Sequence, residues 1–134
     1  MGQHQKRIFS VENAPKAFGP YSPVVQGGPF IFVSGQLGIE PQTGNLAEGI
    51  TEQTRQALLN IKELLDAANS ELANVVKTTV FLADIADFSA MNEIYAQFFS
   101  KEPPARSAFQ VGALPKSALV EIEAIALKSD GCCD

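Results

Sequence analysis

The sequence is poor in the residue types on which most catalytic machinery depends. Its 134 residues contain a single histidine, His4, and only two cysteines, the neighbours Cys132 and Cys133. A Ser-His or Cys-His nucleophile pair would therefore need a terminal tail to enter the site. Zinc sites built from Cys and His are equally disfavoured. We expect neither a metal nor another cofactor, which leaves carboxylates, hydroxyls, tyrosines, arginine and backbone amides for any chemistry.

The chain also lacks a basic cluster, a long apolar run and a glycine-rich phosphate loop. Its formal net charge is -5 at pH 7, with acidic residues spread along the sequence. Nucleic-acid binding depends on clustered Lys and Arg, so we do not expect a nucleic acid as the main partner. No run of about 18 apolar residues is present, and the N-terminus has no apolar signal region, so we expect no membrane partner. Two adjacent cysteines form no disulfide framework, which fits a reducing compartment such as the cytoplasm and leaves an organelle open.

What is present is a clear succession of strand and helix patterns. Strands are predicted over residues 6–10, 24–26, 30–37, 75–82, 106–111 and 118–127. Apolar residues at helical spacing predict a helix over 50–68, and a second helix is expected to start at a capping Asp87 and to end before Pro103 and Pro104. This order favours an α+β two-layer sandwich, with two helices on one face of a mixed six-stranded sheet. We expect a single domain over 1–134, with its core at about 6–128 and flexible tails at 1–5 and 129–134.

One face of such a sheet has no helix to cover it. Phe32, Val80, Phe109 and Ile125 cannot all lie beneath two helices, so part of the uncovered face should be apolar. The sequence therefore predicts a homo-oligomer in which uncovered sheet faces meet.

Arg106 is the first candidate for a binding residue. It follows Pro103-Pro104-Ala105 at the start of an apolar strand. A guanidinium is always charged and has five donors in a fixed arrangement, so it needs a partner when it is partly buried. Two interpretations stay open: an ordinary strand-edge arginine paired with a surface acid, or a clamp on a substrate carboxylate.

Glu121 and Glu123 are the candidate acid–base groups. They are two residues apart on a strand and so share a face with Ile125 and Leu127. A carboxylate in that setting is either a solvated rim charge or a group with a raised pKa. If the last two strands formed a hairpin, Arg106 would lie opposite Ile125, about 13 Å along the strand from Glu121. The two residues could still serve one site in either of two ways. They could come from neighbouring subunits, or the last two strands could be something other than hairpin partners.

Three more residues could line a ligand site. Tyr21 lies in a loop between Pro20 and Ser22, where it is either a packing aromatic or a ligand-facing phenol. Ser34 and Gly35 follow a continuous apolar strand. They are either a simple strand end, or an exposed hydroxyl and an unobstructed amide that face an anion.

The same motifs give the chain a family resemblance. In order and spacing it resembles the RidA/YjgF family of reactive-intermediate deaminases over about residues 6–128. The segments that carry the resemblance are Asn13-Ala14-Pro15, Gly19-Pro20-Tyr21-Ser22, Val33-Ser34-Gly35-Gln36, Val76-Lys77-Thr78-Thr79-Val80-Phe81, Asn92-Glu93-Ile94-Tyr95 with Phe98-Phe99, Pro104-Ala105-Arg106-Ser107, Leu114-Pro115-Lys116, and Val120-Glu121-Ile122-Glu123-Ala124-Ile125-Ala126.

The resemblance implies a chorismate-mutase-like homotrimer with clefts between subunits. The implied activity is hydrolysis of 2-imino acids and their enamines, such as 2-aminoacrylate, to 2-oxo acids and ammonia without a cofactor. Arg106 would hold the substrate carboxylate and Glu121 would activate water, with Tyr21, Ser34 and Gly35 lining the cleft. Because an imine carbon is already electrophilic, acid–base assistance of about 10²–10⁴-fold would be enough.

The chain departs from the family pattern at two positions. Many members have Cys where this chain has Ala108 and Asn where it has Ala86, which removes one thiol and one polar contact. Two alternative functions stay open. One is a non-catalytic or chaperone-like trimer that binds small carboxylates in the same clefts. The other is an endoribonuclease or translation inhibitor, which the net negative charge disfavours.

Overall fold

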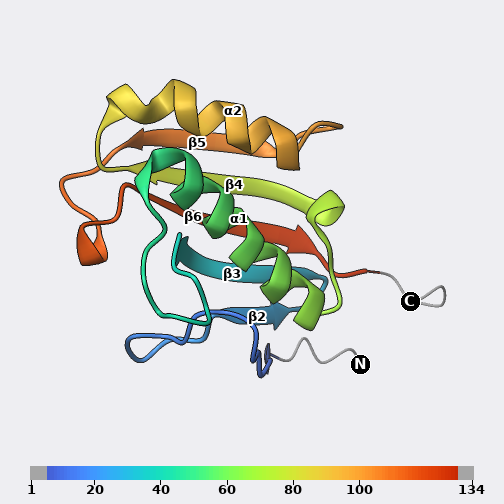
Figure 1. Cartoon of the computed structure of the whole chain (residues 1–134). Helices are drawn as coiled ribbons and strands as arrows, with labels where there is room; N and C mark the ends of the chain where they lie inside the picture. Colours follow the sequence, from blue (N-terminus) through green and yellow to red (C-terminus); the bar gives the residue numbers. More distant parts are fainter. Residues whose placement is uncertain (1–5, 130–134) are drawn as a thin grey trace.

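Six strands form one mixed sheet in the computed structural model, which describes residues 6–129 (Figure 1). The strands are β1 (Lys6–Ile8), β2 (Val24–Gly27), β3 (Phe30–Leu37), β4 (Val75–Leu82), β5 (Ala105–Gln110) and β6 (Val120–Leu127). Their order across the sheet is β1-β2-β3-β6-β4-β5, and only β4 and β5 are parallel among the paired strands. The predicted α+β architecture is therefore confirmed.

The last strand of the chain lies in the middle of the sheet. β6 pairs with β3 on one side and with β4 on the other, both antiparallel, while β5 pairs with β4 at the edge. The last two strands are therefore not hairpin partners. The hairpin on which the 13 Å separation of Arg106 and Glu121 depended does not form.

Two helices cover the same face of the sheet, as Figure 1 shows. They are α1 (Gly49–Ala67) and α2 (Phe88–Phe98), and three short 3₁₀ turns accompany them at Leu72–Asn74, Ile85–Asp87 and Pro115–Ser117. α1 has apolar residues every three or four positions, and this stripe packs on β3 and β6.

Asp87 does precede α2, but its side chain makes no capping hydrogen bond, which corrects the predicted cap. Instead, the carboxylate of Asp84 accepts a 2.9 Å hydrogen bond from the Ala86 N–H, so the acidic cap acts one turn earlier, on the 3₁₀ turn.

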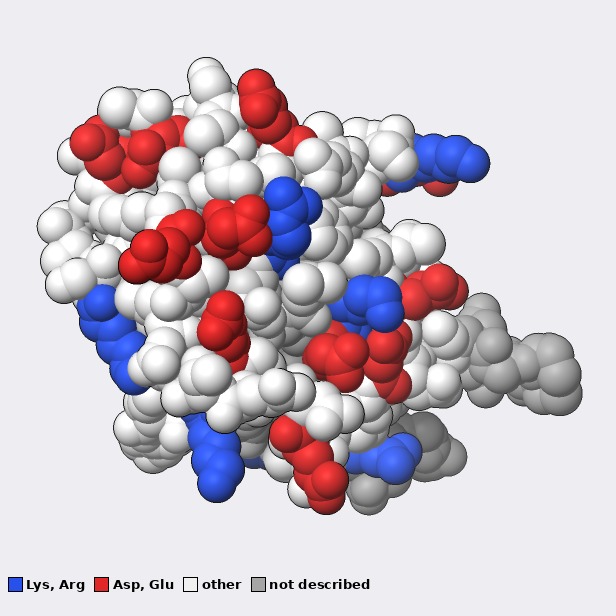
Figure 2. All heavy atoms as spheres, in the orientation of Figure 1, with Lys and Arg blue, Asp and Glu red and all other residues white. Residues whose placement is uncertain are grey.

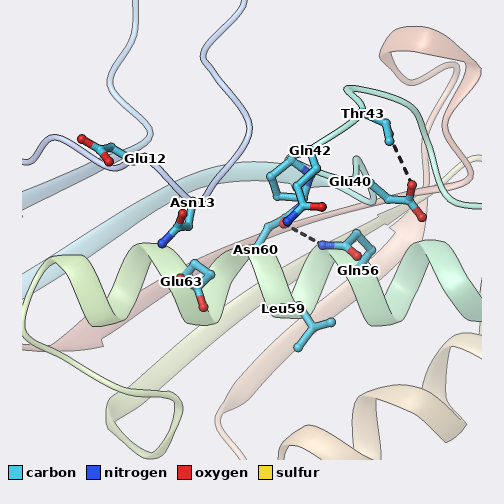
Figure 3. A pocket seen from close by; sticks show the side chains of 10 residues that line it. Glu12, Asn13, Glu40, Gln42, Thr43, Gln56, Leu59, Asn60 and Glu63 are labelled. Carbon is cyan, nitrogen blue, oxygen red and sulfur yellow. Dashed lines mark hydrogen bonds between the residues drawn. The ribbon is translucent and has the colours of Figure 1, made fainter.

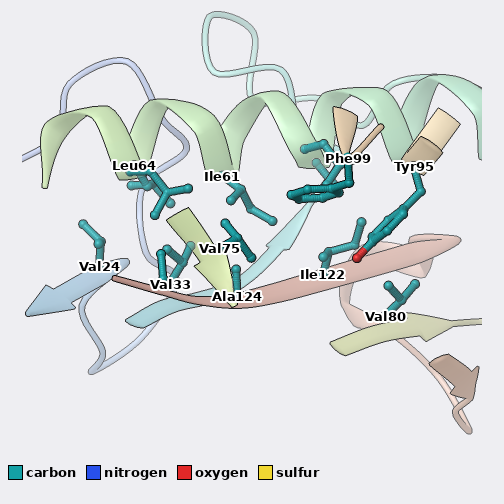
Figure 4. Packing of buried hydrophobic residues seen from close by; sticks show 14 of the residues in the cluster. Val24, Val33, Ile61, Leu64, Val75, Val80, Tyr95, Phe99, Ile122 and Ala124 are labelled. Carbon is teal, nitrogen blue, oxygen red and sulfur yellow. The ribbon is translucent and has the colours of Figure 1, made fainter. Parts of the chain in front are cut away.

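The main core lies between α1, α2 and the sheet, and Figure 4 shows the side chains that fill it. Val33, Ile61, Leu64 and Ile122 are among its members. Val80, which we expected among the residues that two helices could not all cover, is fully buried beneath them. The reason is the alternation of β4, in which Thr78, Val80 and Leu82 share the helix-covered side.

The opposite face of the sheet carries exposed aromatic and aliphatic side chains. Phe32 and Phe109 each retain 44% of their accessible surface, Ile125 is partly buried, and the edge of Phe109 contacts the ring of Phe81. The expectation that Phe32, Val80, Phe109 and Ile125 cannot all lie beneath the helices is confirmed, because Phe32 and Phe109 are exposed although Val80 is covered. The homo-oligomer stays a prediction.

The flexible tails at the chain ends stay a prediction. Ser129, at the start of the expected C-terminal tail, donates its N–H to the Asn69 carbonyl at 2.9 Å. His4, Cys132, Cys133 and the flexibility of residues 1–5 and 130–134 lie outside the described residues. Between residues 6 and 129, no helix is long and apolar enough to cross a membrane.

Candidate functional site

A cleft of about 600 Å³ opens beside the C-terminal half of β3 and the start of β6. Its lining brings together five of the six candidate residues, Tyr21, Ser34, Gly35, Glu121 and Glu123. The other lining residues are Phe18, Gly19, Leu37, Pro115 and Lys116. Loop 12–23, the two central strands and the Pro115–Ser117 turn therefore meet at one place. Arg106 is not part of this cleft in a single chain.

A bulge in β3 places the Glu121 carboxylate. The β3–β6 register shifts between Val33 and Gln36, so Ser34 and Gly35 together lie opposite one residue of β6. The Glu121 side chain lies directly on Gly35. A Cβ atom at Gly35 would come within 2.5 Å of Glu121 Oε2 and 2.9 Å of its Cδ. Glycine is required here because the carboxylate occupies the space that any side chain would take.

The pKa of the Glu121 carboxyl is shifted by its surroundings. Burial raises the pKa of its carboxyl, and the neighbouring negative charge of Glu123 raises it further. Both residues lie in the cleft, at alternate positions of β6. The predicted common face of Glu121 and Glu123 is thus confirmed, and for Glu121 the raised pKa is favoured over a fully solvated rim charge.

Tyr21 and Ser34 are held in place by backbone contacts. The Ser34 hydroxyl donates to the Ser22 carbonyl at 2.7 Å, which leaves its oxygen lone pairs as acceptors toward the cleft. The Tyr21 phenol oxygen accepts a hydrogen bond from the Phe18 N–H at 3.3 Å, and the Tyr21 N–H donates to the Gly19 carbonyl at 2.8 Å. These bonds fold loop 12–23 into a compact turn at the cleft.

Arg106 lies on the other side of the sheet, under α2. Its Nη1 donates to Asn92 Oδ1 at 2.6 Å, and its guanidinium carbon lies 4.8 Å from the Tyr95 ring centroid and 5.4 Å from that of Phe88. Its partners are therefore an amide and two aromatic rings, which contradicts the interpretation of Arg106 as paired with a surface acid. One hydrogen bond uses one of five donors, so the guanidinium keeps donors for an external anion.

The structure thus separates Arg106 from Glu121. Arg106 is in register with Thr78 of β4, which faces the helices, and Glu121 is in register with Phe81, which faces away from them. Successive strand residues point to opposite faces, so these two side chains cannot enter one site within a single chain.

Sequence reasoning missed three residues that belong to these surroundings. Asn92, the partner of Arg106, sits in a recognised motif but had no role assigned. Phe18 and Lys116 line the cleft, and the Lys116 Nζ lies 4.9 Å from the Phe18 ring centroid. Asn92 and Lys116 lie in segments that carry the resemblance, whereas a loop residue such as Phe18 has no periodicity to place it.

A second hollow, of about 650 Å³, lies beside α1 on the helix-covered side (Figure 3). Glu12, Glu40 and Glu63 line it together with the amides of Gln56 and Asn60. The Asn60 side-chain amide accepts a hydrogen bond from Gln56 and donates hydrogen bonds to the Leu37 and Ile39 carbonyls. Its lining contains carboxylates and no Lys or Arg, so this hollow is unsuited to an anionic substrate.

Two broader observations concern metals and charge. Across the described part of the chain, no three Asp, Glu, His or Cys side chains are grouped to hold a metal ion. On the face drawn in Figure 2, Lys and Arg lie among Asp and Glu and form no continuous band.

Comparisons with known proteins agree with these features. The family model described as Endoribonuclease L-PSP matches residues 11–128. A 2-iminobutanoate/2-iminopropanoate deaminase of Capra hircus is 53% identical, over 92% of this chain and 90% of its own length. A RutC family protein of Pyrococcus horikoshii is 51% identical, over 92% of this chain and 98% of its own. The crystal structure of TdcF of E. coli with bound serine has a TM-score of 0.88 and 41% identity, over 92% of this chain and 99% of that one.

Proposed function

Because this chain belongs to the family described as Endoribonuclease L-PSP, the RidA/YjgF family its motifs resemble, we propose that it is an imine deaminase. Its substrates are 2-imino acids such as 2-iminopropanoate and 2-iminobutanoate, with the enamines that form them. The observation that carries this conclusion is the 53% identity over 92% of the chain to a deaminase named for those two substrates. The enzyme thereby removes reactive metabolites that would otherwise damage other proteins.

The chemistry needs only a positioned anion, a positioned water and one acid–base group. The substrate reacts as its protonated imine. The Glu121 carboxylate takes a proton from water while the water oxygen adds to the imine carbon and the C=N π electrons move to nitrogen, giving a neutral carbinolamine. The same carboxyl then donates that proton to the amino nitrogen. As the carbon–nitrogen bond breaks, the hydroxyl oxygen forms the carbonyl and returns its proton to the Glu121 carboxylate, so ammonia and a 2-oxo acid leave. A raised pKa of Glu121 suits both halves of the exchange. Tyr21, Ser34 and the Gly35 backbone line the path of the substrate.

The complete site forms between two subunits of a homotrimer. One subunit supplies the cleft with Glu121, and a neighbour supplies Arg106, which binds the substrate carboxylate in a bidentate manner. Two observations support this arrangement: Arg106 and Glu121 lie on opposite sides of their own sheet, and the uncovered face exposes Phe32 and Phe109. The subunits associate through these sheet faces, in the chorismate-mutase-like arrangement that the resemblance implies.

The alternatives have less support. Two carboxylates in the cleft and a net charge of -5 oppose the binding of an RNA backbone, which an endoribonuclease would require. A protein that only binds carboxylates would not need the raised pKa of Glu121. We also propose a cytoplasmic location, with an organelle as the alternative.

The test follows the decay of an imine made in the same vessel. An amino-acid oxidase generates 2-iminopropanoate from alanine, and the lifetime of the imine is measured with and without the protein. We expect the protein to shorten that lifetime. Arg106→Ala should abolish the effect because the anion clamp is lost, whereas Glu121→Ala should lower kcat more than it raises KM. An unchanged lifetime with the wild-type protein would favour the binding-protein alternative.

A further inference from the structure

The lining of the cleft combines two chemistries. Glu121 and Glu123 supply carboxylates, whereas Phe18, Leu37 and Pro115 supply apolar groups. Leu37 is the register partner of Glu121 on β3, whereas Phe18 and Pro115 come from loop 12–23 and the Pro115–Ser117 turn. The carboxylates belong to the reaction, because Glu121 acts there. The apolar groups have no part in adding water to an imine, so they are available to contact the substituent of the substrate.

Phe18 is an exposed member of that apolar lining. It retains 61% of its accessible surface, whereas Leu37 is buried. An aromatic ring left in solvent at the wall of a cleft gains favourable burial when an apolar ligand covers it, at about 25 cal/mol per Å².

Lys116 fixes the ring in this position. Its ammonium lies 4.9 Å from the Phe18 ring centroid, a cation–π contact. Its backbone has φ 58° and ψ 22°, and the next residue, Ser117, has φ 57°. Two successive non-glycine residues in the left-handed region cost roughly 1–2 kcal/mol each, and they persist only where the surrounding structure holds them. Here Pro115 accepts the Ala118 N–H at 3.0 Å, which closes the turn that presents Lys116 to the ring.

We propose that Phe18 is a specificity-determining residue that binds the side chain of the imino acid, and that Lys116 is the positioning residue that holds its ring. This inference rests on the proposed function and extends it to a substrate class, 2-imino acids with branched or aromatic side chains. The reacting carbon lies near Glu121, and the substituent lies against Phe18 in loop 12–23.

The experiment compares substrates within each variant. Imines are generated from alanine, leucine and phenylalanine, and kcat/KM for each large substrate is divided by the value for the alanine-derived imine. The variants are Phe18→Ala, Phe18→Tyr and Lys116→Met. Leu59→Ala and Lys62→Met, which lie on α1 away from the cleft, are the matched controls. The affinities of pyruvate, 4-methyl-2-oxopentanoate and phenylpyruvate are measured by calorimetry on the same proteins.

Phe18→Ala should lower both large-to-small ratios roughly tenfold, because it removes the apolar contact that only large substituents make. Phe18→Tyr keeps the ring and should keep the ratios. Lys116→Met should lower them about threefold through loss of the cation–π contact. Its loss of charge also affects every substrate, but that effect cancels in the ratio. The controls should leave the ratios unchanged.

Ratios in Phe18→Ala that stay at the wild-type value, or rise, would overturn the proposal for Phe18. Ratios in Lys116→Met that match those of Lys62→Met would overturn the positioning role. Failure of the proposed function has a different signature, namely that the wild-type protein accelerates the decay of no imine. In that case the oxo-acid affinities decide, because Phe18→Ala should still weaken the two large acids relative to pyruvate.

Discussion

Replacing Gly35 with alanine tests whether the position of one carboxylate controls the reaction. The new Cβ would lie 2.5 Å from Glu121 Oε2, 2.9 Å from Cδ and 3.1 Å from Cγ, whereas ordinary contact begins at 3.4 Å. The Glu121 carboxylate must therefore retreat by about 1 Å, a displacement that can cost roughly 10²-fold in rate. We expect kcat of Gly35→Ala for 2-iminopropanoate to fall by about that factor, with a smaller change in KM.

The same substitution should leave the fold intact. The groups that Cβ meets belong to one side chain, which can swing into the open cleft, and Gly35 is not among the glycines with positive φ. Alanine also reduces the entropy of the unfolded chain, so the free energy of unfolding should change by less than about 1 kcal/mol. Gly112→Ala is the matched control, because its Cβ would meet nothing within 4 Å. Wild-type kcat in Gly35→Ala, with an unchanged Tm, would refute the catalytic role given to Glu121.

Three further substitutions give distinct outcomes. Glu123→Gln removes a charge that raises the pKa of Glu121, so the acidic limb of the kcat/KM profile should move to lower pH; a limb that stays in place would exclude this coupling. Asn92→Ala removes the 2.6 Å anchor of Arg106 and should raise KM about tenfold with little change in kcat, which steady-state kinetics would detect. Gly38→Ala would drive Cβ into the backbone of Gln53, which cannot swing aside, and should lower stability by about 2 kcal/mol or more in urea unfolding.

Local patterns were enough to locate most elements of the fold. The predicted strand at 75–82 matches β4, and the predicted helix at 50–68 is displaced by one residue from α1. β-branched runs and apolar residues at helical spacing carry that information within a short window. The end of β1 and the start of β6 were less accurate, each by two residues, because turn residues and strand residues overlap there.

Strand order could not be read in the same way. β6 enters between β3 and β4, which are far from it in sequence, and local periodicity does not record which strands will pair. Two features of the structure therefore could not be predicted from the sequence. The burial of Val80 depends on which face of β4 meets the helices, and so does the separation of Arg106 from Glu121.

The site was predictable where it lies on strands and not where it lies on loops. Alternation along β6 placed Glu121 and Glu123 on one face, and the structure agrees. The cleft wall made by Phe18 and Lys116 depends on two loops that meet only in the folded chain. Likewise, the reason for Gly35 appears only when the Glu121 side chain is seen to fill the space beside it.

The central claim is that Arg106 of one subunit and Glu121 of another complete each active site. Co-expression of equal amounts of Arg106→Ala and Glu121→Ala chains tests it, because mixed oligomers then contain some clefts with an intact Glu121 facing an intact Arg106. Random mixing in a closed ring predicts that about a quarter of the wild-type rate of imine hydrolysis is recovered. A mixture no more active than the two separate variants would contradict the shared site.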